Sequence, residues 1–459
     1  MIKYNRNDKQ SIVLFAKKLI NKSLRTLLDD DSITLYGGKG NFGQLVEEKY
    51  FGYKINSVSE PDFKEVGMEL KCTPLKKLQN GEYKAKERLV LNIINYLEVI
   101  KEEFTLSSFY NKNQNILLIF YLYEKDKSVL DYLVKLVDEW KFPAEDLEVI
   151  KNDWQTIVDK INAGKAHELS EGDTFYLGAC TKGANATSMR KQPFSDVPAM
   201  QRAFSFKQGY VNHIIASIVG EKKTGYGKLI SSPQEVRKRS LDEIIVSKFK
   251  KYYGKSLEQI IQITGIVINP GAKGFTANLT KALLGIELDK EIEEFEKAEL
   301  IVKTVRLKEN LIPKEDMSFP YFKYTELVNQ EWEDSEFKAL LEHKFLIVFL
   351  KIHKGRLFFD KVKFWNMPYN DILEAKKVWE STRDLVMEGN IVHSVTGARR
   401  STNFPSKAFS RVSHVRPHAR TAFDTTPLPV RDKVTGSFEY TKHSFWLNAS
   451  YIKEKIYLR

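Results

Sequence analysis

The stretch 61–71, PDFKEVGMELK, combines two carboxylates and a lysine with an alternating apolar pattern typical of a β-strand. Side chains alternate between the two faces of a strand, so Glu69 and Lys71 share one face and the apolar residues share the other. Asp62, on a preceding strand or turn, completes a small pocket. Carboxylate oxygens are suitable ligands for Mg²⁺, which binds few protein carboxylates and fills its other positions with waters and the oxygens of a phosphate substrate. A lysine there orients the attacking water and stabilises charge on phosphorus, so the stretch predicts a phosphodiester-cutting nuclease.

The Glu-x-Lys pattern alone carries little weight, because 29% of the residues are charged. It recurs in three places where a solvated helix or strand face explains it: 82–84, 336–338 and 374–376. The copy at 69–71 differs in its setting, since apolar residues alternate with it, Asp62-Phe63 precedes it and a Thr-Pro strand end follows it. The rest of the chain therefore decides its meaning.

Composition favours a polyanionic partner. The 459 residues suffice for two or three domains, and the net charge of +12 is spread along the chain, which favours nucleic acid over a small acidic ligand. Only two cysteines occur, so a disulfide framework or a zinc site is not expected and a reducing cytoplasm fits. The first ten residues lack the apolar core of a signal peptide, so none is expected, and the longest apolar run, 116–123, is too short to cross a membrane.

The chain contains an internal repeat. Residues of the first half recur in the same order and at nearly constant spacing in the second half, as the pairs Lys22/Lys255, Lys39/Lys273, Asp62/Glu294, Lys71/Lys303, Trp154/Trp379, Gly164/Gly389 and Tyr210/Tyr451. We therefore expect two copies of one domain, a first repeat at 1–220 and a second repeat at 236–459, joined by a linker at 221–235 that is rich in Gly, Ser and Pro.

Each repeat is expected to be a mixed α/β domain with a mixed sheet flanked by helices. In the first repeat we expect a helix at 11–28, a Gly-rich turn at 37–40, a helix from Asn41, strands at 67–73, 89–95, 116–123 and 175–180, and a helix around Trp154. The second repeat keeps this pattern but places Ile301 at the position of Glu69 and Lys281 at that of Glu47. Isoleucine cannot bind Mg²⁺ and lysine repels it, so only the first repeat is expected to hold a metal site.

Three segments resemble the mismatch-repair endonuclease MutH and, more closely, its two-domain restriction-enzyme relatives that cut GATC. They are KGNFGQLVE (39–47), PDFKEVGMELKCTP (61–74) and LGACTKGANA (177–186), and the resemblance extends over essentially the whole chain. It implies a tandem pair of restriction-endonuclease-like domains, the first catalytic and the second a degenerate DNA-binding or effector domain. It also implies carboxylate ligands for Mg²⁺ at Glu47, Asp62 and Glu69, with Lys71 and Lys112 as active-site lysines. Counting back from Gly52 selects Glu48 in place of Glu47.

The resemblance also suggests DNA contacts. The loop 181–185 matches the base-contacting loop of the family and carries Lys182 and Asn185, while Ser205 replaces the late tyrosine of the family. Basic residues with interleaved aromatic residues follow this loop, and the second repeat has a similar cluster. The further expected contacts are Arg190, Lys207, Arg416, His418 and Arg420.

The leading interpretation is a type II restriction endonuclease that hydrolyses double-stranded DNA at GATC with Mg²⁺. The alternatives are a GATC strand-nicking mismatch-repair endonuclease and a non-catalytic DNA-binding regulator. A GATC methyltransferase encoded beside the gene would favour restriction. GATC is a palindrome, so we expect a monomer that dimerises on its DNA.

Overall fold

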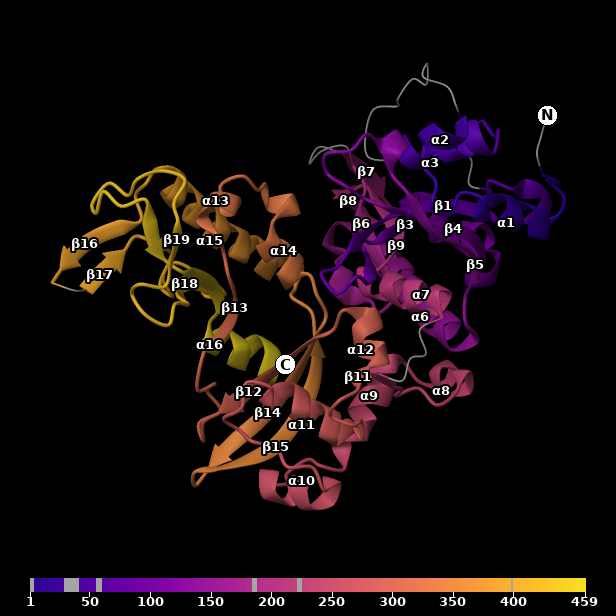
Figure 1. Cartoon of the computed structure of the whole chain (residues 1–459). Helices are drawn as coiled ribbons and strands as arrows, with labels where there is room; N and C mark the ends of the chain where they lie inside the picture. The colour runs from indigo at the N-terminus through magenta and orange to yellow at the C-terminus, as the bar shows by residue number, and fades with distance from the viewer. Residues whose placement is uncertain (1–3, 29–40, 55–59, 184–187, 221–224, 398) are drawn as a thin grey trace. The chain divides into compact units, whose positions relative to one another are not determined.

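The computed structural model describes residues 4–28, 41–54, 60–183, 188–220, 225–397 and 399–459 (Figure 1). They group into two compact units. Unit 1 comprises Met1–Ile244 and Asp289–Leu300, and unit 2 comprises Ile245–Leu288 and Ile301–Arg459. The short segment Asp289–Leu300 thus lies with unit 1 although it belongs to the second repeat by sequence. The boundaries of the repeats, 1–220 and 236–459, remain our proposal for the sequence duplication.

Unit 1 contains two main sheets. The first has the order β2-β1-β4-β5, in which β1 (Glu69–Lys77) and β4 (Asn115–Leu122) are parallel and β2 (Tyr83–Ala85) and β5 (Val134–Lys141) are antiparallel to their neighbours. The second has the antiparallel order β3-β9-β6, from Leu89–Ile93, Arg202–Phe206 and Leu177–Thr181. Strand β4 is buried along Asn115–Tyr121, as its continuous apolar sequence predicts.

Helices and short ribbons surround these sheets. The ribbons are β7 (Met189–Gln192) with β8 (Ser195–Met200) and β10 (Tyr226–Gly227) with β11 (Glu291–Ile292). The helices of unit 1 are α1 (Lys9–Lys17), α2 (Leu24–Leu28), α3 (Asn41–Leu45), α4 (Tyr96–Val99), α5 (Ser108–Asn113), α6 (Ala144–Asn162), α7 (Gln208–Val219), α8 (Pro233–Lys238) and α12 (Glu293–Ala298), and α9 (Leu241–Lys250) crosses the boundary between the units.

Unit 2 repeats the two-sheet arrangement. Its first sheet has the order β12-β14-β15, from Ile301–Leu307, Phe345–His353 and Arg356–Trp365, with β12 and β14 parallel. Its second sheet has the antiparallel order β13-β21-β18, from Met317–Tyr321, His443–Leu447 and Ser413–Pro417. Two ribbons complete its strands, β16 (Val392–Thr396) with β17 (Arg399–Thr402) and β19 (Thr425–Pro427) with β20 (Glu439–Thr441). The helices of unit 2 are α10 (Leu257–Thr264), α11 (Phe275–Leu284), α13 (Tyr324–Leu327), α14 (Glu336–Leu341), α15 (Tyr369–Met387) and α16 (Ala449–Tyr451).

The two units share details that confirm the tandem α/β fold. Helices α6 and α15 have the same length, and each begins directly after a proline. The Tyr210 hydroxyl donates to Asp146 Oδ2 at 3.0 Å, and the Tyr451 hydroxyl donates to Asp371 Oδ2 at 2.9 Å. Both carboxylates lie in the first turn of these two helices. A duplicated domain is the simplest explanation for such a repeated buried hydrogen bond.

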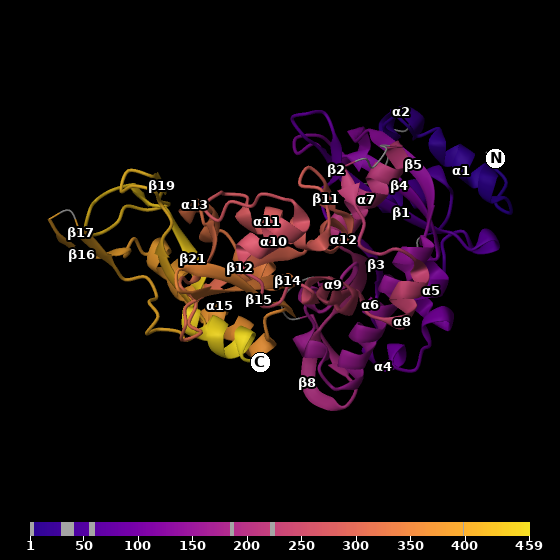
Figure 2. The ribbon, with the colours of Figure 1, turned by 90° about the horizontal axis from the view of Figure 1, so that it is seen from below.

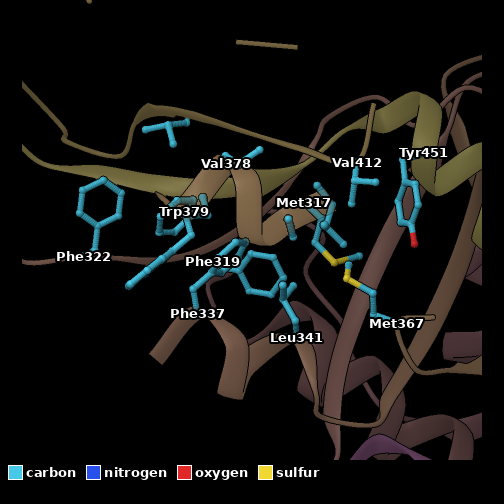
Figure 3. Packing of buried hydrophobic residues seen from close by; sticks show 14 of the residues in the cluster. Met317, Phe319, Phe322, Phe337, Leu341, Met367, Val378, Trp379, Val412 and Tyr451 are labelled. Carbon is cyan, nitrogen blue, oxygen red and sulfur yellow. The ribbon is translucent and has the colours of Figure 1, made fainter. Parts of the chain in front are cut away.

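Apolar packing holds each unit together. Figure 3 shows the core of unit 2, where Phe319 and Phe337 lie near Trp379 of α15 and Met317 lies near Met367. Trp154 in unit 1 and Trp379 in unit 2 are both almost completely buried. These two tryptophans had matched in the sequence comparison because each fills the core beneath the long helix.

Three expectations need correction or lie outside the described residues. The helix expected at 11–28 is divided into α1 and α2, because the chain turns at Asn21, which has a φ of 60°. Strand β1 continues through Pro74 to Lys77, since proline needs no N–H where it pairs with Tyr121. The Gly-rich turn at 37–40 lies outside the described residues.

None of the helices in the described ranges is long and apolar enough to cross a membrane.

Gly164 provides a test of the packing beneath α6. It has a φ of 72°, and a Cβ there would lie 2.6 Å from the carbonyl oxygen of Phe194, whereas Gly81 has a φ of 90° and open space around it. We expect Gly81→Ala to cost about 1–2 kcal/mol of unfolding free energy from backbone strain alone. Gly164→Ala should cost at least about 1 kcal/mol more, because the carbonyl must move. Denaturant unfolding measures both; equal losses would contradict the packing described.

Candidate active site

A tight reversal of the chain brings Asp62 beside Glu69. The backbone of Phe63 bridges to Met68, and a short helical turn, Lys64–Val66, ends at Gly67 in the left-handed conformation. The Leu70 N–H donates to Asp62 Oδ2 at 2.9 Å, and the Asp62 N–H donates to Glu69 Oε2 at 3.2 Å. Backbone hydrogen bonds therefore hold both carboxylates at the first residues of β1.

Two lysines converge on the same carboxylate. Glu69 is 2% exposed, and its Oε1 lies 2.7 Å from Lys71 Nζ and 3.6 Å from Lys112 Nζ. Lys71 shares the face of Glu69 on β1, as strand alternation predicts. Lys112 lies on α5, which Ser107 caps, and the neighbouring Asn113 donates to Asn92 Oδ1 at 3.0 Å. The sequence-predicted residues Asp62, Glu69, Lys71 and Lys112 thus form one cluster.

Glu47 completes the cluster from a different element. It lies in a π-helical turn, Val46–Tyr50, that continues α3, and such turns often occur at functional sites. Burial, with the nearby charges of Asp62 and Glu69, raises the pKa of Glu47 to about 7. The neighbouring Glu48 pairs instead with Lys49 Nζ at 3.3 Å. The geometry therefore favours Glu47 over Glu48 as the third carboxylate.

Burial and the neighbouring carboxylates disfavour the ionised forms of Glu47 and Glu69. Burial raises the pKa of Glu69 to about 6; Asp62 adds to the increase, while Lys71 and Lys112 oppose it. A divalent cation would relieve the repulsion among the three carboxylates. Within the described residues no three Asp, Glu, His or Cys side chains stand at metal-binding distances from one another. Mg²⁺ takes one or two carboxylates and several waters, so the donor set nonetheless fits this ion.

The expected DNA contacts of the first repeat divide into two groups. Lys182 is exposed directly after β6, and Arg190 is exposed on β7, so both present a cation to solvent. Asn185 lies outside the described residues. Ser205 is fully buried on β9, and Lys207 is 4% exposed with its Nζ donating to Thr174 O at 2.7 Å. The last two side chains face the protein interior, which corrects the expectation that they contact DNA.

The expected contacts of the second repeat lie on or after β18. Arg416, His418 and Arg420 are all exposed. The guanidinium of Arg416 lies 4.3 Å from the ring centre of Trp446 and pairs with Asp316 Oδ2 at 3.3 Å. His418 Nδ1 is 3.0 Å from Ser444 Oγ. These contacts hold the basic side chains in place at the surface of unit 2.

Unit 2 lacks the chemistry of unit 1 at the matching positions. Ile301 begins β12 and pairs with Phe345, just as Glu69 begins β1 and pairs with Ile116. Lys281 is buried, with its Nζ donating to Leu288 O at 3.2 Å. Helix α14, capped by Ser335 as α5 is by Ser107, has Leu340 where α5 has Lys112. Sequence comparison had missed this third loss, because only the shared serine cap aligns the two helices.

Comparisons with known proteins agree with this geometry. The family model "DNA mismatch repair enzyme MutH" matches residues 51–153 and 284–371, one match in each repeat. The chain is 40% identical to "Type II restriction enzyme Sau3AI" of Staphylococcus aureus, with 98% of each sequence covered. It is 30% identical to "DNA mismatch repair protein MutH" of Shewanella woodyi over 33% of this chain and 63% of that protein. The corresponding protein of Shewanella amazonensis is 27% identical over 33% of this chain and 65% of that protein.

The raised pKa of Glu47 predicts a stability effect in the absence of metal. Its folded-state pKa of about 7 exceeds the ordinary 4.5, so its favourable contribution is present at low pH and lost as the pH rises through 7. Glu47→Gln should therefore raise the melting temperature at pH 8 in EDTA and change it little at pH 5. Glu48→Gln is the matched control, because Glu48 pairs with Lys49. An unchanged or lower melting temperature for Glu47→Gln at pH 8 would contradict this placement.

Proposed function

The chain belongs to the type II restriction enzymes related to MutH, and from this we propose that it hydrolyses both strands of double-stranded DNA at GATC with Mg²⁺. The family makes it a site-specific deoxyribonuclease. The observation that carries the proposal is the cluster of Asp62, Glu69 and Lys71 at the start of β1, where Glu69 Oε1 lies 2.7 Å from Lys71 Nζ. The GATC target rests on the resemblance of three sequence segments to GATC-cutting enzymes.

Among Glu47, Asp62 and Glu69, one or two carboxylates together with waters would hold Mg²⁺, which when bound polarises the scissile phosphate and lowers the pKa of a bound water. The protein groups do the rest. Lys71 donates a hydrogen bond to the attacking water and orients it toward phosphorus. Lys112, which approaches the same Glu69 oxygen as Lys71, stabilises the charge that develops on the phosphate oxygens. The backbone hydrogen bonds between Asp62 and β1 keep the carboxylates in place, so little rearrangement is needed.

Basic side chains at the surface would bind the DNA backbone. Lys182 and Arg190 of the first repeat are exposed near the end of β6 and on β7, and Arg416, His418 and Arg420 serve the same purpose in the second repeat. Phosphate contacts of this kind give affinity that falls with salt. A cognate GATC methyltransferase would protect the host DNA, and the cytoplasm is the proposed location because the substrate is DNA.

The two alternatives explain less. A strand-nicking mismatch-repair endonuclease shares the site, but the mismatch-repair relatives align with only 33% of this chain. A non-catalytic regulator accounts for unit 2, yet it leaves no purpose for two carboxylates and two lysines gathered in unit 1.

Double-strand cleavage requires more than one chain in this proposal. One chain offers one intact site, whereas the two scissile phosphates of a palindrome are related by a two-fold axis. Two chains would therefore bring their first units together on one GATC site. The second units would then be available to hold another GATC sequence as an effector. We propose a monomer in solution that pairs on DNA.

Removing a carboxylate should separate cleavage from binding. We expect Asp62→Ala and Glu69→Ala to lower the cleavage rate roughly a hundred- to a thousandfold or more, because the metal site is lost. Binding to a GATC duplex should stay within about threefold, since surface cations provide it. Glu65→Ala is the control, an exposed carboxylate in the same reversal of the chain. Near-normal cutting of a GATC plasmid by either site variant would remove the basis of the assignment.

The effector role predicts a dependence on the number of sites. Plasmids with two GATC sites should be cut several times faster per site than plasmids with one, because the second unit needs its own DNA. The comparison is made by gel assay over a range of enzyme concentrations. Equal rates per site across that range would refute the effector role but not the active site.

A further inference from the structure

Helix α12 occupies the place in the second repeat that the metal-ligand segment occupies in the first. Glu294 and Phe295 match Asp62 and Phe63 in sequence. The backbone agrees: the turn after Asp62 ends at Gly67 with a φ of 59°, and α12 ends at Glu299 with a φ of 52°. Each left-handed residue stands two positions before its strand, β1 or β12. The segment that carries a metal ligand in one repeat has therefore become α12 in the other.

Helix α12 nevertheless packs in unit 1, against α7 (Figure 1). Figure 2 shows the same two helices side by side from below. The approach is close, because a Cβ on Gly209 would collide with the carbonyl oxygen of Glu296. Lys207, which precedes α7, places its buried Nζ 3.4 Å from Ala298 O at the end of α12. The beginning of α7 is thus shaped to receive this helix.

Buried charges fasten the helix to unit 1. Lys297 is 3% exposed, and its Nζ lies 2.7 Å from Asp146 Oδ1 and 2.8 Å from Glu293 Oε1. Its ammonium also lies 5.5 Å from the ring centre of Tyr176. Glu294, the counterpart of Asp62, accepts the N–H groups of Leu229 and Ile230 at 2.8 and 2.9 Å. Moving α12 away would leave a buried charge without its partner, which is strongly unfavourable, so these charges favour one position of the helix.

Two hydrogen bonds connect α7 to the catalytic sheet. Gln208 Nε2 donates to Ala85 O at 2.6 Å, and the Ala85 N–H donates to Asn212 Oδ1 at 2.8 Å. Ala85 lies on β2 and pairs with Leu75 of β1, the strand that begins with Glu69. In the other direction along the chain, α12 is followed at Ile301 by β12 of unit 2. The helix therefore stands in the chain between the second unit and the sheet of the active site.

We propose that α12 is the coupling element through which the second unit acts on the active site. The proposal rests on the effector role stated under Proposed function and names its route: DNA on unit 2 acts on β12, the seating of α12 on α7 changes, and α7 positions β2 and β1. A cavity of about 180 Å³ beside Lys297, lined also by Lys228 and Glu293, gives the helix room to shift. Gly209 and Lys297 are positioning residues in this scheme.

Gly209→Ala in the full-length enzyme tests the proposal. Alanine has a higher helix propensity than glycine, so the substitution should not destabilise α7 unless α12 packs against this position. Ser217→Ala, at an exposed position of α7, is the matched control. We expect Gly209→Ala to accelerate hydrogen exchange in 289–300, to lower kcat about ten- to a hundredfold with KM unchanged, and to abolish the preference for two-site plasmids. Ser217→Ala should behave as wild type in all three measurements.

Circular dichroism and melting curves establish that the variant is folded, and Glu294→Ala provides a milder second variant that should shift the same three measurements in the same direction. Wild-type kcat and an intact two-site preference in both folded variants would overturn the coupling while leaving the effector role standing. Equal cutting of one-site and two-site plasmids by the wild type would remove the effector role and the coupling with it. In that event, a low kcat for Gly209→Ala would mean that α12 helps to position the active site but does not transmit a signal from the second unit.

Discussion

The parallel pairing of β1 with β4 is the constraint on which the site depends. Parallel strands begin at the same edge of a sheet, so the connection from β1 must return to the edge where Glu69 lies before β4 can start. That connection ends in α5, and Lys112 consequently arrives 3.6 Å from the Glu69 carboxylate. The reversal that holds Asp62 and the π-helical turn that holds Glu47 add their carboxylates at this edge. The topology therefore brings residues from four separate segments of sequence to one small cluster.

Unit 2 keeps the parallel pairing of its first two strands but lacks the carboxylate and lysine that unit 1 has at the matching positions. Its strands β12 and β14 are parallel in the matching register, but Ile301 begins the first of them and leucine replaces the lysine of α5. Ile301 is partly buried, and as an uncharged side chain it avoids the cost of burying a carboxylate, which is the main cause of the raised pKa of Glu69 in unit 1. Apolar packing, not the charged cluster, sustains the fold, so a repeat can lose these charged side chains and still fold. The carboxylate that would have been its Asp62 now joins α12 to the first unit.

Much of this could be predicted from sequence because the informative features are local or repeated. Alternation placed Glu69 and Lys71 on one face of a strand, and the second copy showed which charges the scaffold does not need. Long-range contacts were beyond such reasoning. Lys207 resembles a surface cation in sequence, yet its stem and ammonium are buried against Thr174 and Ala298. The apolar periodicity predicted one helix where the structure has α1 and α2, because periodicity carries no information on the turn at Asn21. No local sequence pattern indicates that α12 packs outside its own repeat.

The claim that one chain holds a single metal site, in the first unit, is tested most directly by metal-directed cleavage of the protein backbone. Fe²⁺ accepts the same oxygen ligands as Mg²⁺, and with ascorbate and peroxide it generates radicals that cut the chain nearby. The account predicts fragments ending near Glu47, Asp62 and Glu69, suppressed by excess Mg²⁺ and absent from Glu69→Ala. Fragments ending near Lys281 and Ile301, or cuts at neither place, would contradict it.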